Sequence, residues 1–218
     1  MYFKSRAEAG KLLGEKLVKR YRDKDCAVVA LNDGAVMVAA QIAARLHCVM
    51  MFLLAEAIKL PREDVAIAGL SQNGAVTYNN FYSPVQIEEF VSEYHTMIEE
   101  QKIDKMKSMN RLLGKGGLIK KSLLRDRNVI LVSDGLANGF SLDLAVEFLK
   151  PVRTKRVIIA TPLASTSAVD RMHVLTDEIE CLSVIEDYMS TDHYYDKQDI
   201  PDHATVIRII EQIVGQWQ

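Results

Sequence analysis

Two segments of the chain combine residue types and spacing that suit phosphate binding. In residues 28–40, and again in residues 128–149, an apolar run ends in a short loop that contains glycine, and a helix-forming sequence follows. The first turn of a helix carries backbone N–H groups without partners and the positive end of the helix dipole, so an anion is stabilised there. A tight strand-to-helix turn needs a glycine in any case, so spacing alone leaves a purely structural turn open.

These segments belong to an alternation of predicted strands and helices. Short apolar runs predict buried strands at residues 26–31, 49–54, 128–132, 156–160 and 179–184. Apolar residues at helical spacing predict helices at 7–19, 35–46, 139–149, 165–172 and 204–214. Strand–helix–strand units imply parallel pairing, so we expect an α/β domain with a central parallel sheet. In such sheets ligands bind beyond the carboxyl ends of the strands.

An insertion of about residues 71–127 interrupts this alternation within one predicted domain of residues 1–218. The Asn73-Gly74 pair between two short apolar runs predicts a type I′ hairpin turn. Ser83-Pro84-Val85-Gln86 then has the pattern of a capping box with proline at the first helical position. We expect one continuous helix from Ser83 to Leu113.

Composition excludes several classes of protein. Hydrophobic residues make up 49% and charged residues 26% of the 218 residues, as in globular proteins with a real core. A formal net charge of −2 argues against a strongly basic nucleic-acid binder. The three cysteines are too few and too scattered for a disulfide framework. The N-terminus has no signal-peptide pattern and no tract reads as a membrane span, so we expect a cytoplasmic protein with reduced thiols.

Residues 128–149 resemble the phosphoribosyl diphosphate (PRPP) binding motif of type I phosphoribosyltransferases. Val129–Val132 matches the apolar run of that motif, Asp134 stands at the second of its two acids, and the phosphate loop matches Ala137-Asn138-Gly139-Phe140-Ser141. The similarity extends over almost the whole chain, from residues 3–13 to the aromatic loop near 193–195. It implies the fold of that family, with a small hood formed by about residues 185–218 and the N-terminus.

The resemblance also implies a chemistry. In the family an acceptor attacks C1 of PRPP, pyrophosphate leaves, and Mg²⁺ bridges the pyrophosphate. Asp134 would hold the ribose hydroxyls, and the loop of residues 137–141 would hold the 5′-phosphate. The acceptor base cannot be deduced, because acceptor recognition lies in variable loops.

The chain departs from the family motif at several positions. Ser133 replaces the first acid, so it cannot help to stabilise positive charge that develops on the ribose. Asn138 replaces the threonine of the phosphate loop. Where the subgroup has Pro-Arg-Gly-Gly in its pyrophosphate loop, this chain has Asn32-Asp33-Gly34-Ala35. We interpret Asp33 as a helix cap. Asp143, in the first turn of the next helix, would disfavour a bound anion.

Two further segments match functional regions of the family. Residues 102–127 are basic and stand where the family has a mobile catalytic loop, so Lys105, Arg111 and Lys115 are candidate lid residues; a solvated charged face is the alternative. Tyr194 and Tyr195 fall where relatives cover the acceptor, and their rings could stack on a base. A packed loop is equally consistent with those two tyrosines.

The sequence therefore predicts a diverged phosphoribosyltransferase-like protein that binds PRPP or a nucleoside monophosphate, with transferase activity weak or lost. A non-catalytic nucleotide sensor or protein-interaction relative is the alternative, and an RNA-binding regulator is disfavoured by the near-neutral charge. Whether the chain is an enzyme stays open. The predicted long helix carries an apolar stripe that must be buried against something, which predicts a homodimer; the stripe is Ile87, Phe90, Val91 and Tyr94.

Overall fold

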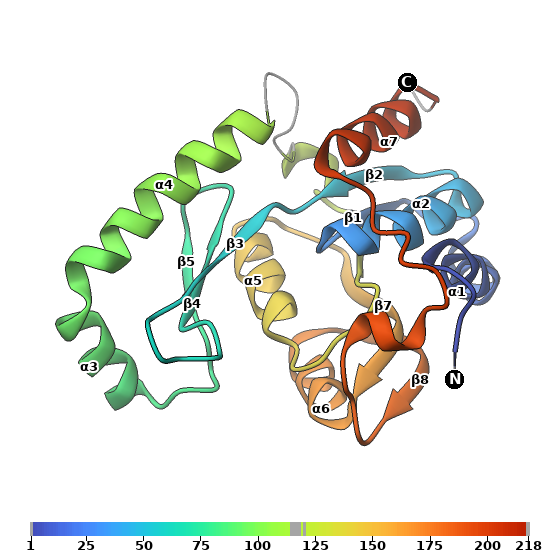
Figure 1. The fold of residues 1–218 in the computed structure, drawn as a ribbon. Helices are drawn as coiled ribbons and strands as arrows, with labels where there is room; N and C mark the ends of the chain where they lie inside the picture. Colours follow the sequence, from blue (N-terminus) through green and yellow to red (C-terminus); the bar gives the residue numbers. More distant parts are fainter. Residues whose placement is uncertain (1, 114–118, 120, 217–218) are drawn as a thin grey trace.

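The computed structural model describes residues 2–113, 119 and 121–216. Its centre is a five-stranded parallel sheet in the order β2-β1-β6-β7-β8 (Figure 1). The predicted parallel α/β architecture is thus confirmed. The register pairs Ala27 with both Val49 and Val129 across the middle of the sheet. The strands are β1 (Cys26–Ala30), β2 (Val49–Phe52), β6 (Asn128–Val132), β7 (Arg156–Ser165) and β8 (Glu178–Ile185).

Helices cover both faces of this sheet because alternate residues of each strand point to opposite sides. Val28, Ile130 and Ile158 contribute to one apolar core, and their sequence neighbours Val29, Leu131 and Ile159 to the other. The first core is closed by α1 (Arg6–Tyr21), α2 (Asp33–Leu46) and α7 (His203–Gln216), and the second by α5 (Phe140–Leu149) and α6 (Thr166–Leu175).

Polar side chains define where these helices begin. Ser5 accepts a hydrogen bond from Glu8 N at the start of α1, and Ser165 accepts one from Ala168 N at the start of α6. Asp202 Oδ1 accepts from Thr205 N at 2.8 Å at the start of α7. Across the described residues, we find no helix with the length and apolar character needed to cross a lipid bilayer.

Residues 55–113 form an extension beside the main sheet, which we call the arm (Figure 1). It consists of the three-stranded antiparallel sheet β3-β4-β5 and two helices. The chain passes from β2 to β3 almost without a break, and the short AEAI sequence of β3 has no clear strand pattern that would predict it. The elements of the arm are β3 (Ala55–Ile58), β4 (Ala68–Ser71), β5 (Val76–Tyr78), α3 (Pro84–Glu93) and α4 (His95–Leu113).

The predicted type I′ turn of the arm is wrong. A type I′ turn requires positive φ at both central residues, but only Gly74 of the Asn73-Gly74 pair has it, with φ of 82°. Gly74 N donates to Ser71 O at 2.8 Å and Ser71 N donates to Ala75 O at 2.9 Å. The hairpin therefore closes through a three-residue loop that ends on the glycine, a common alternative.

The predicted continuous helix is also wrong, because it breaks at Tyr94. Its start is as predicted: Ser83 and Gln86 form the reciprocal capping box. Tyr94 leaves helical geometry, with φ of −109° and ψ of 22°, and separates α3 from α4. Both helices contribute apolar residues to the first core, with Phe90 half-buried and Ile98 buried.

Candidate functional site

The two glycine-containing loops predicted from the sequence lie side by side. They follow β1 and β6, which are adjacent parallel strands paired from Cys26–Asn128 to Ala30–Val132. Leu31 N donates to Val132 O at 2.9 Å and extends the pairing into the loops. A Cβ added to Gly34 would lie 2.1 Å from Asp134 Oδ2, so the first loop tolerates no side chain where it meets the second. This edge of the sheet is the candidate site.

Asp134 is buried and bound to an arginine that the sequence did not single out. Arg6 Nε donates to Asp134 Oδ2 at 2.7 Å, and the Arg6 side chain is completely buried. The hydroxyl of Tyr195 donates to the Asp134 carbonyl at 2.6 Å. Burial raises the pKa of the Asp134 carboxyl, and the Arg6 guanidinium offsets part of that rise. The carboxylate assigned by resemblance to ribose hydroxyls is thus already an internal ion-pair partner.

Arg6 itself is held by two more carboxylates. Its guanidinium bonds Asp192 Oδ1, and its Nη1 lies 3.3 Å from Asp199 Oδ1. It also stacks over the Tyr195 ring, 4.5 Å from the centroid. In the sequence, Arg6 stands at the start of a predicted helix, and neither its type nor its spacing distinguishes it from an arginine that would lie at the surface. Only the tertiary structure brings its partners together.

The Ser133 side chain is bound within a local backbone turn. It is fully buried, and its hydroxyl donates to Gly135 O at 2.9 Å, while Gly135 N donates back to Ser133 Oγ at 3.3 Å. These bonds close a tight turn directly after β6. The hydroxyl that replaces the family acid therefore has a local partner in the backbone.

The predicted phosphate loop forms the N-terminus of α5. Gly139 is the N-cap with φ of 74°, a conformation that favours glycine. Asn138 Oδ1 accepts from Phe140 N at 3.1 Å, so one amide of the loop already has a partner within it. Ala137 and Asn138 are exposed, and Ser141 is half-buried in the first turn. The loop thus combines an exposed rim with the positive end of a helix.

A second arginine that sequence reasoning missed neutralises the acid beside this loop. The Arg171 guanidinium bonds Asp143 Oδ1, with Nε at 2.8 Å. A Cβ added to Gly139 would lie 3.0 Å from the Arg171 Cβ, so the stem of this side chain packs against the loop. The charge of Asp143, predicted to disfavour an anion, is therefore paired with a cation.

The predicted pyrophosphate loop begins α2. Asn32 is the cap, because its Oδ1 accepts from Ala35 N at 2.7 Å. Asp33 is the first residue of the helix, so its predicted capping role is wrong by one position. A carboxylate in the first turn still interacts favourably with the helix dipole. No residue from Asn32 to Ala35 is cationic.

The candidate lid residues lie in different settings. Lys105 Nζ lies 3.8 Å from Glu56 Oε2 of the arm, and the Arg111 side chain is exposed near the end of α4. Lys115 lies outside the described residues. After this gap, Lys121 lies over the Phe148 ring, at the opposite end of α5 from the phosphate loop. The role of the basic segment as a lid stays a prediction.

Tyr194 and Tyr195 are both buried, with exposed fractions of 6% and 4%. Tyr195 packs against Phe3 and lies under Arg6. The Tyr194 hydroxyl donates to Asp187 O at 3.3 Å. Both rings are part of a small apolar cluster, so stacking on an acceptor stays a prediction that requires this cluster to rearrange.

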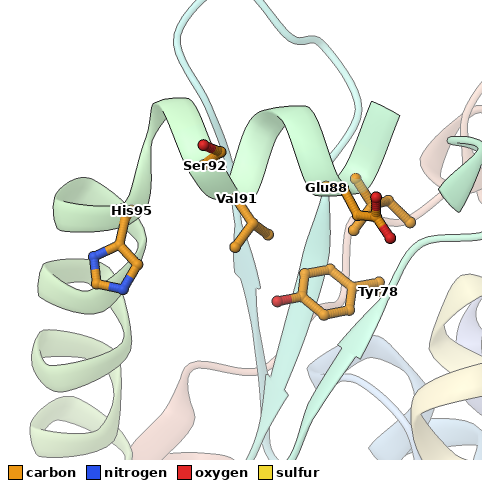
Figure 2. Close-up of a pocket in the computed structure, with 6 residues that line it drawn as sticks. Tyr78, Glu88, Val91, Ser92 and His95 are labelled. Carbon is orange, nitrogen blue, oxygen red and sulfur yellow. The ribbon is translucent and has the colours of Figure 1, made fainter. Parts of the chain in front are cut away.

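A cavity lies away from this edge, on the arm. It measures about 520 Å³ and is open to solvent between α3 and β5. Figure 2 shows Tyr78, Val91 and His95 around it. Glu88 and Ser92 add polar groups to its wall. None of these residues belongs to the two predicted loops.

Comparison with known proteins identifies the family. The model of the phosphoribosyl transferase domain matches residues 3–198. A Mycobacterium tuberculosis protein, provisionally named a phosphoribosyl transferase, is 22% identical over 182 residues, which are 83% of this chain. The match covers only 40% of the length of that relative. The crystal structure of TT1426 from Thermus thermophilus has the same fold, with a TM-score of 0.71 and 23% identity over 97% of this chain and 99% of that one. The chain belongs to the phosphoribosyl transferase domain family.

Proposed function

We propose that this chain binds a phosphorylated ribose compound, PRPP or a nucleoside monophosphate, at the strand–loop–helix segment of residues 128–149, and that its transferase activity is weak or lost. The observation that carries the proposal is the Arg6–Asp134 ion pair at 2.7 Å beside a loop without cations. The family fold and the Gly139 loop support binding of a phosphate. The pairing of Asp134 and the residues at 32–35 support the loss of turnover.

Each substrate group would have a definite partner in this proposal. The 5′-phosphate would lie against the N-terminus of α5, bound by backbone N–H groups and the dipole. The ribose hydroxyls would reach Asp134 and the turn that begins at Ser133. The β-phosphate end of PRPP would meet the loop that contains Asp33. Arg6, which packs against Gly34 of this loop, is already balanced by carboxylates.

Magnesium would have to be bound mainly through the ligand. Within the described residues, no group of three or more histidine, cysteine or acidic side chains is arranged to hold a metal ion. Asp134 is engaged by Arg6, and Ser133 offers a neutral oxygen with a backbone partner. The residues present thus do not fit a site that holds Mg²⁺ by itself.

The expected loss of rate follows from the missing charges. A group that stabilises charge in a transition state contributes about 10²–10³-fold in rate. The chain lacks one acid at Ser133 and the cation of the pyrophosphate loop. Losses of groups that act together rarely add, so we expect a severe deficit rather than the full product of the two factors.

Calorimetry tests this proposal directly. PRPP and a panel of nucleoside monophosphates are titrated with and without Mg²⁺, and pyrophosphate release is assayed with the common bases. Binding without turnover is the expected result. Robust turnover would overturn the loss of activity, and the absence of binding to every ligand would overturn the site. The variant Asp33→Arg with Ser133→Asp is expected to bind PRPP more tightly if only the charges are missing.

The assembly and location of the protein are part of the proposal. The apolar stripe that predicted a homodimer, Ile87, Phe90, Val91 and Tyr94, is partly buried against the core of this chain, so it does not need a partner. We still propose a homodimer in which the arm contributes to the interface, because four other large apolar side chains of the arm are exposed: Phe81, Val85, Met97 and Ile103. A cytoplasmic location is consistent with three free cysteines.

A further inference from the structure

The strongest feature that the motif does not predict is a cluster of one buried cation, Arg6, and three carboxylates. Arg6 bonds Asp134 after β6 and, in the 187–199 loop, Asp192 and Asp199. The Asp134 side chain is 7% exposed, whereas the Asp192 side chain is 51% exposed. A buried guanidinium must keep such partners, because an unpaired charge in the interior is very costly. The cluster therefore fastens three distant parts of the chain together.

Backbone hydrogen bonds make the same connection. Phe3 N donates to Tyr194 O at 2.9 Å, and Asp196 N donates to Phe3 O at 2.9 Å. Lys197 N donates to Lys4 O at 3.2 Å. The N-terminal segment and the 187–199 loop thus pair along one short ladder beside the Arg6 cluster. If the loop moves, Arg6 loses two of its three carboxylates.

The cluster also limits access to Asp134. A Cβ at Gly34 would lie 2.1 Å from Asp134 Oδ2 and 2.8 Å from Arg6 Nε, so both groups pack directly on the first loop. Tyr195 covers the other side of the guanidinium and bonds the Asp134 carbonyl. A ribose hydroxyl that donates to Asp134 must therefore share or replace the bond from Arg6.

We propose that Arg6 is a positioning residue that holds the site closed: it occupies Asp134 and, through Asp192 and Asp199, keeps the 187–199 loop fastened to the N-terminal segment. Ligand binding and loop opening are then coupled, and the coupling acts in both directions. When only a fraction of the protein molecules is in the binding-competent state, the apparent affinity for the ligand is lowered by that fraction. Weakening the fastening makes the ligand bind more tightly. This inference rests on the proposed function for its ligand, but not for the fastening itself.

The test uses Asp192→Asn/Asp199→Asn, which weakens the hold on Arg6 without changing Asp134 or the phosphate loop. The matched control is Asp187→Asn/Asp196→Asn, which removes two charges from the same loop where no bond to Arg6 is found among the described contacts. Hydrogen–deuterium exchange follows the 187–199 amides in the absence of ligand. We expect exchange to rise about tenfold or more in the first variant and to stay near wild type in the control.

Affinity is then measured by calorimetry with adenosine 5′-monophosphate and PRPP. We expect Asp192→Asn/Asp199→Asn to bind about fivefold or more tightly than wild type, within the usual range of coupling, and the control to change less. Equal affinity in both variants would overturn the inference, because general electrostatics would then explain the gain.

Two further outcomes concern a wild-type protein that binds no ligand. If wild type binds nothing but the first variant binds, the closed site is supported. If neither protein binds, both the closure and the proposed function are rejected. Unchanged exchange in the first variant would reject the fastening alone.

Discussion

The Arg6 guanidinium and the Asp134 carboxylate meet at 2.7 Å directly above the backbone of Gly34. This contact joins the start of α1 to the turn after β6 across 128 residues of sequence. It engages the carboxylate that the family resemblance assigns to ribose.

Breaking this pair from one side is expected to be costly. Arg6→Met leaves Asp134 buried without its cation, and the loss of one partner of a buried pair costs about 3–5 kcal/mol in the free energy of unfolding. Arg6→Met/Asp134→Asn removes both charges and is expected to recover a large part of that loss. Urea denaturation of the three proteins measures the effect. A loss below about 1 kcal/mol for Arg6→Met would show that the pair contributes little.

Gly34 is expected to tolerate no substitution, because the Cβ of Gly34→Ala would overlap the Asp134 carboxylate and approach Arg6. We expect a net destabilisation of about 1–3 kcal/mol, as for overpacking elsewhere. Thermal unfolding measures it.

The control for Gly34 is Gly14→Ala in α1. Its added Cβ would meet the Arg45 Cδ at 2.6 Å, which is part of a flexible side chain that can shift. A helical alanine is favoured over glycine by about 0.5–1 kcal/mol, so this variant is expected to be neutral or more stable. Equal destabilisation of the two variants would contradict the special role of the Gly34 contact.

The phosphate loop is expected to depend on Gly139. Gly139→Ala strains a residue with φ of 74° and brings its Cβ to 3.0 Å from Arg171, so the loop must shift. We expect the affinity for a nucleoside monophosphate to fall at least about tenfold, which corresponds to about 1.4 kcal/mol.

Gly74→Ala provides the matched control, since Gly74 has φ of 82° with open space around its Cβ position. In both variants the alanine at positive φ costs a similar amount of stability, about 1 kcal/mol, but only Gly139 lies in the candidate site. Calorimetry on both variants separates strain from binding. Equal affinities would exclude the loop as the phosphate site.

A pH dependence of stability is expected from Glu178. The bond from the Tyr21 hydroxyl, followed by the Arg156 and Arg20 guanidinium groups, lowers the pKa of Glu178 below its usual 4.5. A carboxyl with a lowered folded-state pKa stabilises the fold above its unfolded pKa and loses that contribution as pH falls through the folded value. Glu178→Gln should therefore lose stability at neutral pH and show a shallower decline below pH 4.5 in urea titrations. Parallel curves for both proteins would contradict this.

The arm is expected to form the interface of a homodimer. Ile103→Glu and Val85→Glu place charges on side chains that are 53% and 63% exposed in the arm. Light scattering at micromolar concentration should show a dimer for wild type and a shift toward monomer for these variants. Val174→Glu, at a position 74% exposed on α6, is the control and should leave the mass unchanged. A monomeric wild-type protein would contradict the prediction.

Local patterns in the amino-acid sequence are enough to predict the layered architecture and the two glycine-containing loops that follow its strands. The β6 strand begins and ends at the predicted residues, Asn128 and Val132, because an apolar run bounded by polar residues has few other stable arrangements. Local hydrogen bonding likewise explains why the Ser83 capping box is predictable. The motif of residues 137–141 identifies the loop from the sequence, since its glycine and the following helix are adjacent in the chain.

Long-range packing, in contrast, decides how the groups of the site are engaged. Arg6 meets Asp134, Asp192 and Asp199 through contacts that span up to 193 residues, and no local pattern reports such distances. Asn32 rather than Asp33 caps α2, a one-residue difference that depends on backbone geometry where both side chains are good caps. The break at Tyr94 is a local change of backbone geometry that periodicity does not report, since periodicity alone favours a continuous helix. Residue spacing predicts which groups share an edge, whereas the tertiary contacts determine which of them are already bound to one another.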